Sequence, residues 1–138
     1  PCWAWMGEFE DRIPLDFDGV ASAEGSFSWM CRDSSKPGRP PGERWVVHAS
    51  EEFSQRHLEA SSEEINRRIA EEFEKRFGGR RIYSTTHRWR YASASPRSQD
   101  SEPFQWDEGL SLGICGDALA GEGVESAWVS AVALSSVL

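Results

Sequence analysis

The chain has 138 residues, and its 15 Lys and Arg against 23 Asp and Glu give a formal net charge of −8. That length can bury the core of one ordinary domain, and an aromatic content of 12% excludes an intrinsically disordered chain. The acidic balance argues against general binding to nucleic acid or to anionic membranes, and no apolar run approaches the roughly 18–20 residues that span a bilayer.

The cysteines and the two ends of the sequence bear on its context. Cys2, Cys31 and Cys115 form an odd and widely spaced set, which fits the cytoplasm or another reducing soluble compartment better than a disulfide framework. The sequence opens inside an expected strand without an initiator Met, and it closes on an apolar helix without a cap. We therefore expect it to be part of a larger protein.

The first two thirds of the chain predict a sheet with one long helix. Alternating and β-branched apolar residues predict strands at 1–10, 27–31, 44–50 and 81–92. Three Pro and two Gly predict a loop over 33–42.

The helix is expected over residues 62–77. Ser61 and Glu64 have the spacing of a capping box, and apolar residues recur every four positions from Ile65 to Phe77. Glu–Arg and Glu–Lys pairs at i,i+4 add support on the exposed side, and Gly78-Gly79 should end the helix.

The pattern changes in the last part of the chain. A polar loop is expected from Ser93 to about Asp107, then a buried strand at 110–115, a glycine-rich turn at 116–123 and a helix at 124–137. Because the last helix carries no charge after Glu125, it should be buried on most of its sides.

The most informative constellation is the strand–turn–helix around Gly116-Asp117. It places a carboxylate after a strand and before the N-terminus of a helix, where free N–H groups and a partial positive charge favour an electron-rich ligand. The carboxylate of Asp117 would accept hydrogen bonds from the hydroxyls of a ribose or ribitol. A purely structural turn explains the same spacing, and from spacing alone it is slightly favoured.

A second constellation is His87-Arg88-Trp89-Arg90-Tyr91. Basic residues interleaved with aromatic ones can bind phosphate and stack on bases. The alternation can equally place Trp89 and Tyr91 on one face of a strand and the arginines on the other, and the net charge favours this solvated strand over nucleic-acid binding.

Other motifs give weaker indications of function. The loop Ser34-Ser35-Lys36-Pro37-Gly38-Arg39 has two cations that could hold an anion, but most such loops are solvated turns. The three histidines lack metal-ligand spacing, so we expect no metal site, and His48 is interpreted as a satisfied core residue.

Seven motifs in order resemble the renalase-like branch of the FAD-dependent amine oxidases. They are Pro1-Cys2-Trp3-Ala4, Leu15-Asp16-Phe17-Asp18-Gly19, Ser28-Trp29-Met30, Ser34-Ser35-Lys36-Pro37-Gly38-Arg39, Trp45-Val46-Val47-His48-Ala49-Ser50, His87-Arg88-Trp89-Arg90-Tyr91-Ala92 and Gly113-Ile114-Cys115-Gly116-Asp117. The resemblance covers essentially all of the chain and implies a C-terminal fragment, whose missing N-terminal part would hold the FAD pyrophosphate.

The resemblance also implies a fold. Residues 1–107 would be part of a substrate-binding domain, with a mixed or antiparallel sheet and one amphipathic helix. Residues 108–138 would be the last strand and helix of a Rossmann-like FAD-binding domain. The fold class is thus α+β for this chain and α/β for the parent protein.

Roles follow by resemblance for matched positions. Gly116 and Asp117 would contact FAD ribitol or ribose-phosphate hydroxyls, and the segment with Gly123, Val124, Glu125 and Ala127 would pass the pyrimidine edge of the flavin. On the substrate side, Trp89 would face the isoalloxazine, and Arg88 beside it would also contact the substrate. Ala118 and Ser126 depart from the Trp and Gly that the family often has there.

The function implied is hydride transfer from an amine or a dihydronicotinamide-type small molecule to flavin, with oxygen as the expected acceptor. The fragment alone should be inactive. The alternative is a non-catalytic α+β binding module that uses a face with Arg88, Trp89 and Tyr91. A single-stranded nucleic-acid binder is a third, weaker hypothesis.

Overall fold

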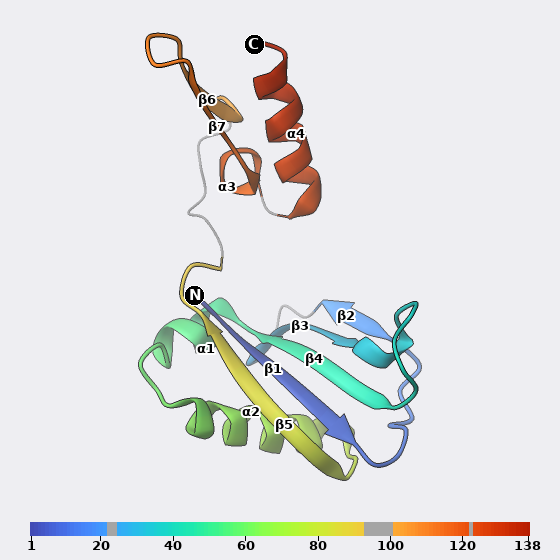
Figure 1. Ribbon diagram of the computed structural model, residues 1–138. Helices are drawn as coiled ribbons and strands as arrows, with labels where there is room; N and C mark the ends of the chain where they lie inside the picture. The colour runs from blue at the N-terminus through green and yellow to red at the C-terminus, as the bar shows by residue number, and fades with distance from the viewer. Residues whose placement is uncertain (22–24, 93–100, 122) are drawn as a thin grey trace. The chain divides into compact units, whose positions relative to one another are not determined.

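The structure is a computed structural model of the chain and describes residues 1–21, 25–92, 101–121 and 123–138. It consists of two compact units, Pro1–Ala92 and Ser93–Leu138 (Figure 1). The α+β class expected from the sequence is confirmed, since both units combine helices with antiparallel strands.

The first unit is built on a five-stranded antiparallel sheet with the order β2-β3-β4-β1-β5. The four strands predicted from sequence are confirmed, and the short β2 is added at the edge. The strands are β1 (Cys2–Phe9), β2 (Gly19–Ala21), β3 (Phe27–Arg32), β4 (Glu43–Ala49) and β5 (Arg81–Trp89).

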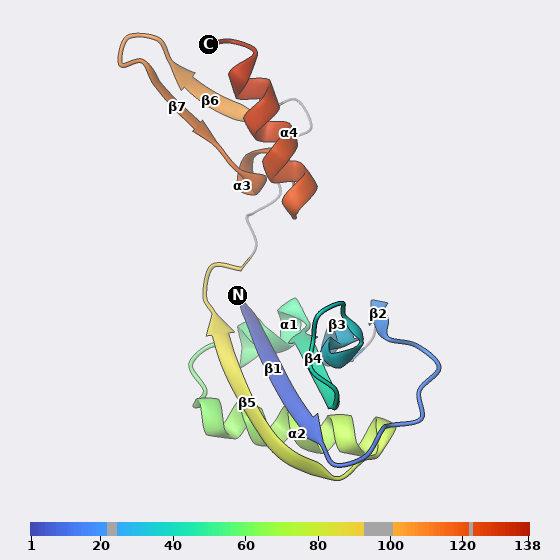
Figure 2. The same ribbon diagram turned by 45° about the vertical axis from the view of Figure 1, so that its right-hand side comes forward.

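Two helices cover one face of this sheet, α1 (Glu51–Arg56) and α2 (Ser62–Phe77) (Figure 2). The core lies between them and the sheet, because alternate strand residues point to opposite faces. In β1, Trp3, Trp5 and Phe9 belong to this core. The ring of Trp5 crosses the backbone at Gly7, where an added Cβ would lie 2.0 Å from a ring carbon. Glycine therefore makes room for the Trp5 ring.

The long helix α2 forms as its sequence predicts. The Ser61 hydroxyl caps the N-terminus by accepting the Glu64 N–H at 3.2 Å. Ile65, Ile69 and Phe73 are fully buried against the sheet. The helix ends at Gly78, whose φ of 74° is unfavourable for residues with a Cβ.

Of the four i,i+4 pairs expected on the charged side of α2, two form. These are Glu64–Arg68 and Glu72–Arg76. Arg67, however, pairs with Glu71, one turn further along the helix, rather than with Glu63. Such exposed pairs add only a few tenths of a kcal/mol each.

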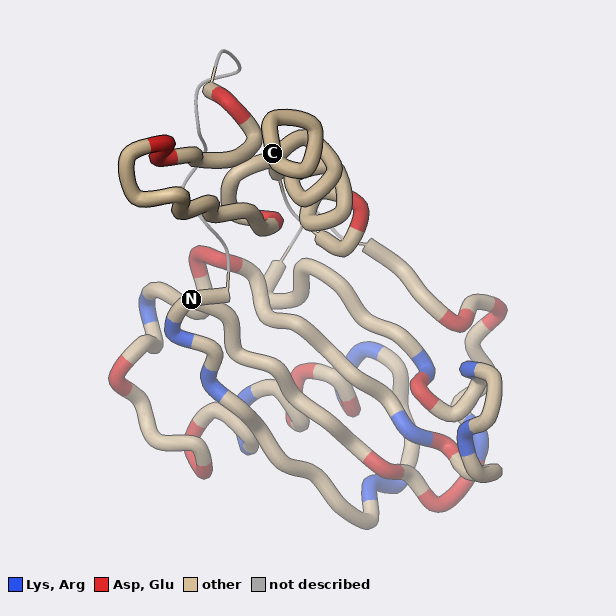
Figure 3. The backbone as a smooth tube through the Cα atoms, turned by 45° about the horizontal axis from the view of Figure 1, so that its top comes forward, with Lys and Arg blue, Asp and Glu red and all other residues tan. Residues whose placement is uncertain are grey.

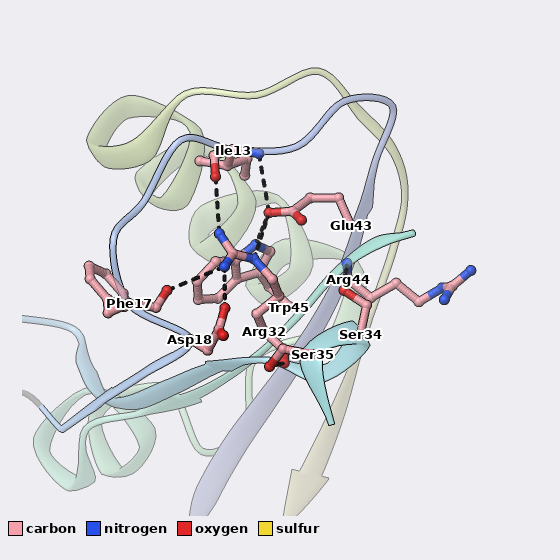
Figure 4. Close-up of polar contacts among 9 residues, drawn as sticks. All are labelled: Ile13, Phe17, Asp18, Arg32, Ser34, Ser35, Glu43, Arg44 and Trp45. Carbon is pink, nitrogen blue, oxygen red and sulfur yellow. Dashed lines mark hydrogen bonds and ion pairs between the residues drawn. The ribbon is translucent and has the colours of Figure 1, made fainter. Parts of the chain in front are cut away.

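A buried ion pair holds the loop between β1 and β2 onto the sheet (Figure 4). The Arg32 guanidinium, 1% exposed, donates to Glu43 Oε1 at 3.1 Å and to the Ile13 carbonyl at 3.0 Å, and it also binds the Asp18 carboxylate. Glu43 Oε1 accepts a further hydrogen bond from Trp45 Nε1 at 2.8 Å. The Arg32 side chain of β3 therefore anchors the loop that carries residues 15–18 of the 15–19 motif.

The second unit pairs a two-stranded antiparallel sheet with a helix. Its elements are β6 (Phe104–Asp107), β7 (Leu112–Cys115), the single turn α3 (Asp117–Ala120) and α4 (Val124–Ser135). β7 and α4 agree with the predicted strand and helix. The expected polar loop over Ser93–Asp107 is wrong in its last part, since β6 forms there, and 93–100 lie outside the described residues.

The expected burial of this unit is also wrong within the described structure. Leu112 and Ile114 of β7 are exposed, and so are Val124, Trp128 and Val132 of α4. The reason is that β7 and α4 each find a partner on one side only, where Gly113 lies under Leu134. An apolar composition predicts that a surface is buried, but it does not identify the residues that would bury it.

The division between the units differs from the expected one. A boundary at 107/108 would separate β6 from β7, which pair from Phe104↔Cys115 to Asp107↔Leu112. The compact units divide instead at 92/93. The assignment of the units to substrate-binding and FAD-binding domains stays a prediction, as does a Rossmann-like setting for β7 and α4.

Charge is distributed unequally between the units (Figure 3). Residues 1–92 contain fourteen basic and sixteen acidic residues, whereas 93–138 contain one basic and seven acidic residues. The net charge of −8 therefore belongs mainly to the second unit.

Candidate functional site

The residues predicted to bind a cofactor all lie in the second unit, and the two predicted to bind substrate lie in the first. In the second unit, Gly116 directly follows β7 and Asp117 opens the single turn α3. Asp117 is exposed, and its Oδ1 accepts the N–H of Ala118 at 2.8 Å. This bond leaves the other carboxylate oxygen to accept hydrogen bonds from a ligand hydroxyl.

The second part of the predicted cofactor site is the N-terminus of α4. Gly123 is the residue before the helix, with a φ of 92°, and as a glycine it has no side chain with which to cap the first turn. Val124 is 88% exposed, and Glu125 lies in the first turn. Ala127 is half-buried and donates its N–H to the Gly123 carbonyl. Exposed N–H groups and the helix dipole at this end favour an electron-rich group.

In the first unit, Trp89 lies on the sheet face that α1 and α2 do not cover, called here the open face. Directly opposite residues of neighbouring strands share a face. The pairs Cys2↔Trp89, Ala4↔His87 and Ala4↔His48 therefore place these side chains on the open face, and Trp29↔His48 adds Trp29. Trp89 is 55% exposed, and its ring centroid lies 4.4 Å from that of His87.

His48 is misassigned by the sequence interpretation. It is not a core residue, because it lies half-buried on the open face with its ring 5.1 Å from that of Trp29. Strand alternation could have shown this, since Trp45, Val47 and Ala49 of β4 are the core residues. Partial burial, aided by the charge of Lys36, lowers the pKa of His48 below its usual range.

The lowered pKa of His48 predicts a loss of stability in mild acid. The unfolded chain, with an ordinary pKa of about 6.5, binds the proton more readily than the folded one, so stability rises with pH between the two values. We expect unfolding temperatures measured from about pH 7.5 down to about pH 5 to fall, and His48→Gln to reduce the fall.

An NMR titration of His48 gives its pKa directly. A value at or above that of an ordinary histidine would contradict the prediction.

Arg88 does not share the face of Trp89. Its guanidinium lies 5.4 Å over the ring of the core residue Trp3, and it donates to the Leu58 carbonyl. A single binding face made of Arg88, Trp89 and Tyr91, which the alternative hypothesis requires, is therefore wrong. The alternation that the sequence left open places the arginine on the helix side.

Arg90 is also held on the first unit. Its guanidinium binds both carboxylate oxygens of Glu59 at 2.8 Å. This two-point contact raises the pKa of Arg90 and lowers the pKa of Glu59. The basic residues of the 87–91 motif therefore serve intramolecular contacts.

The loop with Lys36 and Arg39 follows the 3-10 helix Asp33–Ser35. Both cations are directed to one carboxylate, with Lys36 Nζ 2.8 Å and Arg39 Nε 3.3 Å from the oxygens of Asp33. The hydrogen bond from Lys36 lowers the pKa of Asp33. This agrees with a structured, solvated turn.

A shallow depression of about 720 Å³ lies over the two helices and contains none of the predicted site residues. Arginines line it, but carboxylates neutralise them. Arg67 pairs with Glu71, and Arg76 pairs with Glu72. We therefore assign no anion site to this depression.

No known family model matches the chain. In the part of the chain that the structure describes, no three His, Cys, Asp or Glu side chains gather closely enough to hold a metal ion. The helices of that same part are too short or too polar to cross a membrane. All three cysteines are free thiols.

Proposed function

We propose that this chain is the C-terminal portion of an FAD-dependent oxidoreductase that transfers a hydride from an amine or dihydronicotinamide-type substrate to flavin, with oxygen as the acceptor. The observation that carries the proposal lies in the second unit. There, the exposed carboxylate of Asp117 and the N-terminus of α4, which begins after Gly123, both follow β7 within one short segment.

These residues fit part of an FAD molecule. A Cβ added at Gly116 or at Gly123 would have nothing within 4 Å, so a ligand can approach the backbone closely at both positions. The carboxylate of Asp117 suits the hydroxyls of ribitol or ribose. The first turn of α4, with Gly123, Val124 and Glu125, suits the electron-rich pyrimidine edge of the flavin, with Ala127 one turn along.

The described part of the same unit offers no cationic side chain to the pyrophosphate. Residues 101–138 contain six acidic residues and no Lys or Arg. We therefore place the pyrophosphate contacts in a preceding part of the same protein, as the sequence resemblance implies. The apolar residues exposed on β7 and α4 support this, because they are surfaces that further structure would bury.

When bound, FAD would supply the hydride acceptor. The residues of this chain bind and orient. Asp117 holds hydroxyls, and the helix N-terminus stabilises negative charge at the ring edge. On the substrate side, the open face of the first unit offers the exposed ring of Trp89, which suits a ring-shaped or cationic substrate, and the His87 ring meets it edge-on at 63°. We name no proton donor or acceptor among these residues.

The test of the proposal is flavin binding by the longer protein that contains this chain. Purified protein should carry a flavin absorbance spectrum, and its sequence should contain a strand–GxGxxG–helix unit before Pro1. Asp117→Ala should weaken FAD binding by roughly 10–100-fold, because a hydrogen bond to a charged group is lost. Titration calorimetry or fluorescence quenching measures the affinity.

The control is Glu108→Gln, which removes an exposed carboxylate from the turn between β6 and β7 of the same unit. It should leave FAD affinity unchanged. Unchanged affinity in Asp117→Ala would remove this residue from the site, and a protein without flavin and without the upstream unit would refute the proposed function.

A further inference from the structure

The hydroxyl of Ser130 joins three segments of the second unit. Its Oγ accepts the N–H of Gly116 at 2.9 Å and donates to the carbonyl oxygen of Pro103. Ser130 is fully buried. One side chain therefore ties α4 to the entry of β6 and to the turn that follows β7.

This use of a helical serine is unusual. A serine inside a helix ordinarily returns its hydroxyl to a carbonyl one turn earlier, and Ser135 of the same helix does so, donating to the Val132 carbonyl at 2.8 Å. Ser130 makes its contacts with residues 14 and 27 positions away. Its hydroxyl therefore connects parts of the unit that are distant in the sequence.

The bond to Gly116 controls the position of the neighbouring carboxylate. Gly116 precedes Asp117, so fixing its N–H fixes the direction in which the chain enters α3 and from which Asp117 emerges. Ser130 also lies seven residues along α4 from Gly123, about 10 Å at 1.5 Å per residue. The same contact thus sets the separation between the carboxylate and the N-terminus of α4.

We propose that Ser130 is a positioning residue of the candidate cofactor site, which holds the Gly116-Asp117 turn in register with the N-terminus of α4. This inference rests on the proposed function for the identity of the ligand. Ser130 itself is buried and does not touch the ligand.

The test compares Ser130→Ala with Ser135→Ala, which removes a hydroxyl from the same helix, in the longer protein that contains this chain. We expect Ser130→Ala to weaken FAD binding roughly tenfold, the size expected when a buried donor loses its partner. Hydrogen exchange at the Gly116 amide, measured without flavin, should accelerate. Ser135→Ala should change neither quantity.

A second variant guards against misfolding. Ser130→Cys keeps a similar volume but has a weak donor and acceptor, so it should show a smaller loss of affinity in the same direction. If Ser130→Ala accelerates exchange at Gly116 while FAD affinity stays at the wild-type value, Ser130 has only a structural role. The inference about Ser130 then fails, while the proposed function stands. If the wild-type protein binds no FAD, the proposed function fails and this role with it.

Discussion

Arg32→Ala is expected to destabilise the first unit by about 3–5 kcal/mol, the cost of leaving one partner of a buried ion pair without the other. Glu43 would remain buried with its charge, retaining only the neutral donors Trp45 Nε1 and the Ile13 N–H. The loop that contains Phe17 and Asp18 would also lose its anchor. Urea unfolding followed by tryptophan fluorescence measures the change.

Two further variants isolate the cause. Arg39→Ala removes an exposed arginine paired with Asp33 and should cost less than about 1 kcal/mol. In the Arg32→Ala background, Glu43→Gln removes the buried charge but keeps an oxygen acceptor for Trp45, so it should recover part of the loss. A double variant no more stable than Arg32→Ala would show that the uncompensated charge is not the reason.

Phe73→Ala should cost a comparable amount, about 3–5 kcal/mol, because it opens a cavity at the centre of the core. The Phe73 ring is fully buried in an aromatic cluster, 5.3 Å from Trp5, 5.2 Å from Phe9 and 5.7 Å from Trp45 between ring centroids. These neighbours come from two different strands, β1 and β4, so the collapse of one side cannot fill the space. Thermal and urea unfolding both report the loss.

The matched control is Phe77→Ala, one turn later on the same helix. Phe77 is only partly buried, although its ring lies 5.0 Å from that of Phe73. Its removal should cost clearly less. Equal losses at the two positions would mean that the core does not centre on Phe73.

Local patterns predict the first unit well. The cap at Ser61, the four-residue stripe from Ile65 and the glycine stop at Gly78 all concern neighbours along the chain, and all three are confirmed. The strand periods likewise identify β1, β3, β4 and β5. Because each of these elements finds its partners within residues 1–92, local pattern and tertiary packing agree.

Local sequence patterns predict the structure of the second unit less well. The strand β6 has only four residues, and it is defined by its pairing with β7 rather than by a strong pattern of its own. The absence of charge after Glu125 predicts that α4 is buried on most sides, yet its apolar residues are exposed in the described structure, because nothing local says which atoms would cover them. His48 is misassigned, and the face of Arg88 is left open, for a similar reason, since the face of a strand residue is known only once its neighbours are paired.

The place of β1 in the middle of the sheet has a consequence for biosynthesis. β1 is hydrogen-bonded to β4 on one side and to β5 on the other. Ala4, for example, lies opposite both His48 and His87. Both partners are translated after β1, since β4 begins at Glu43 and β5 only at Arg81. The edge of β1 that bonds to β5 therefore stays without its partner strand until the end of β5 has left the ribosome. Sheets that depend on such distant contacts fold slowly, so we expect this unit to fold slowly as well.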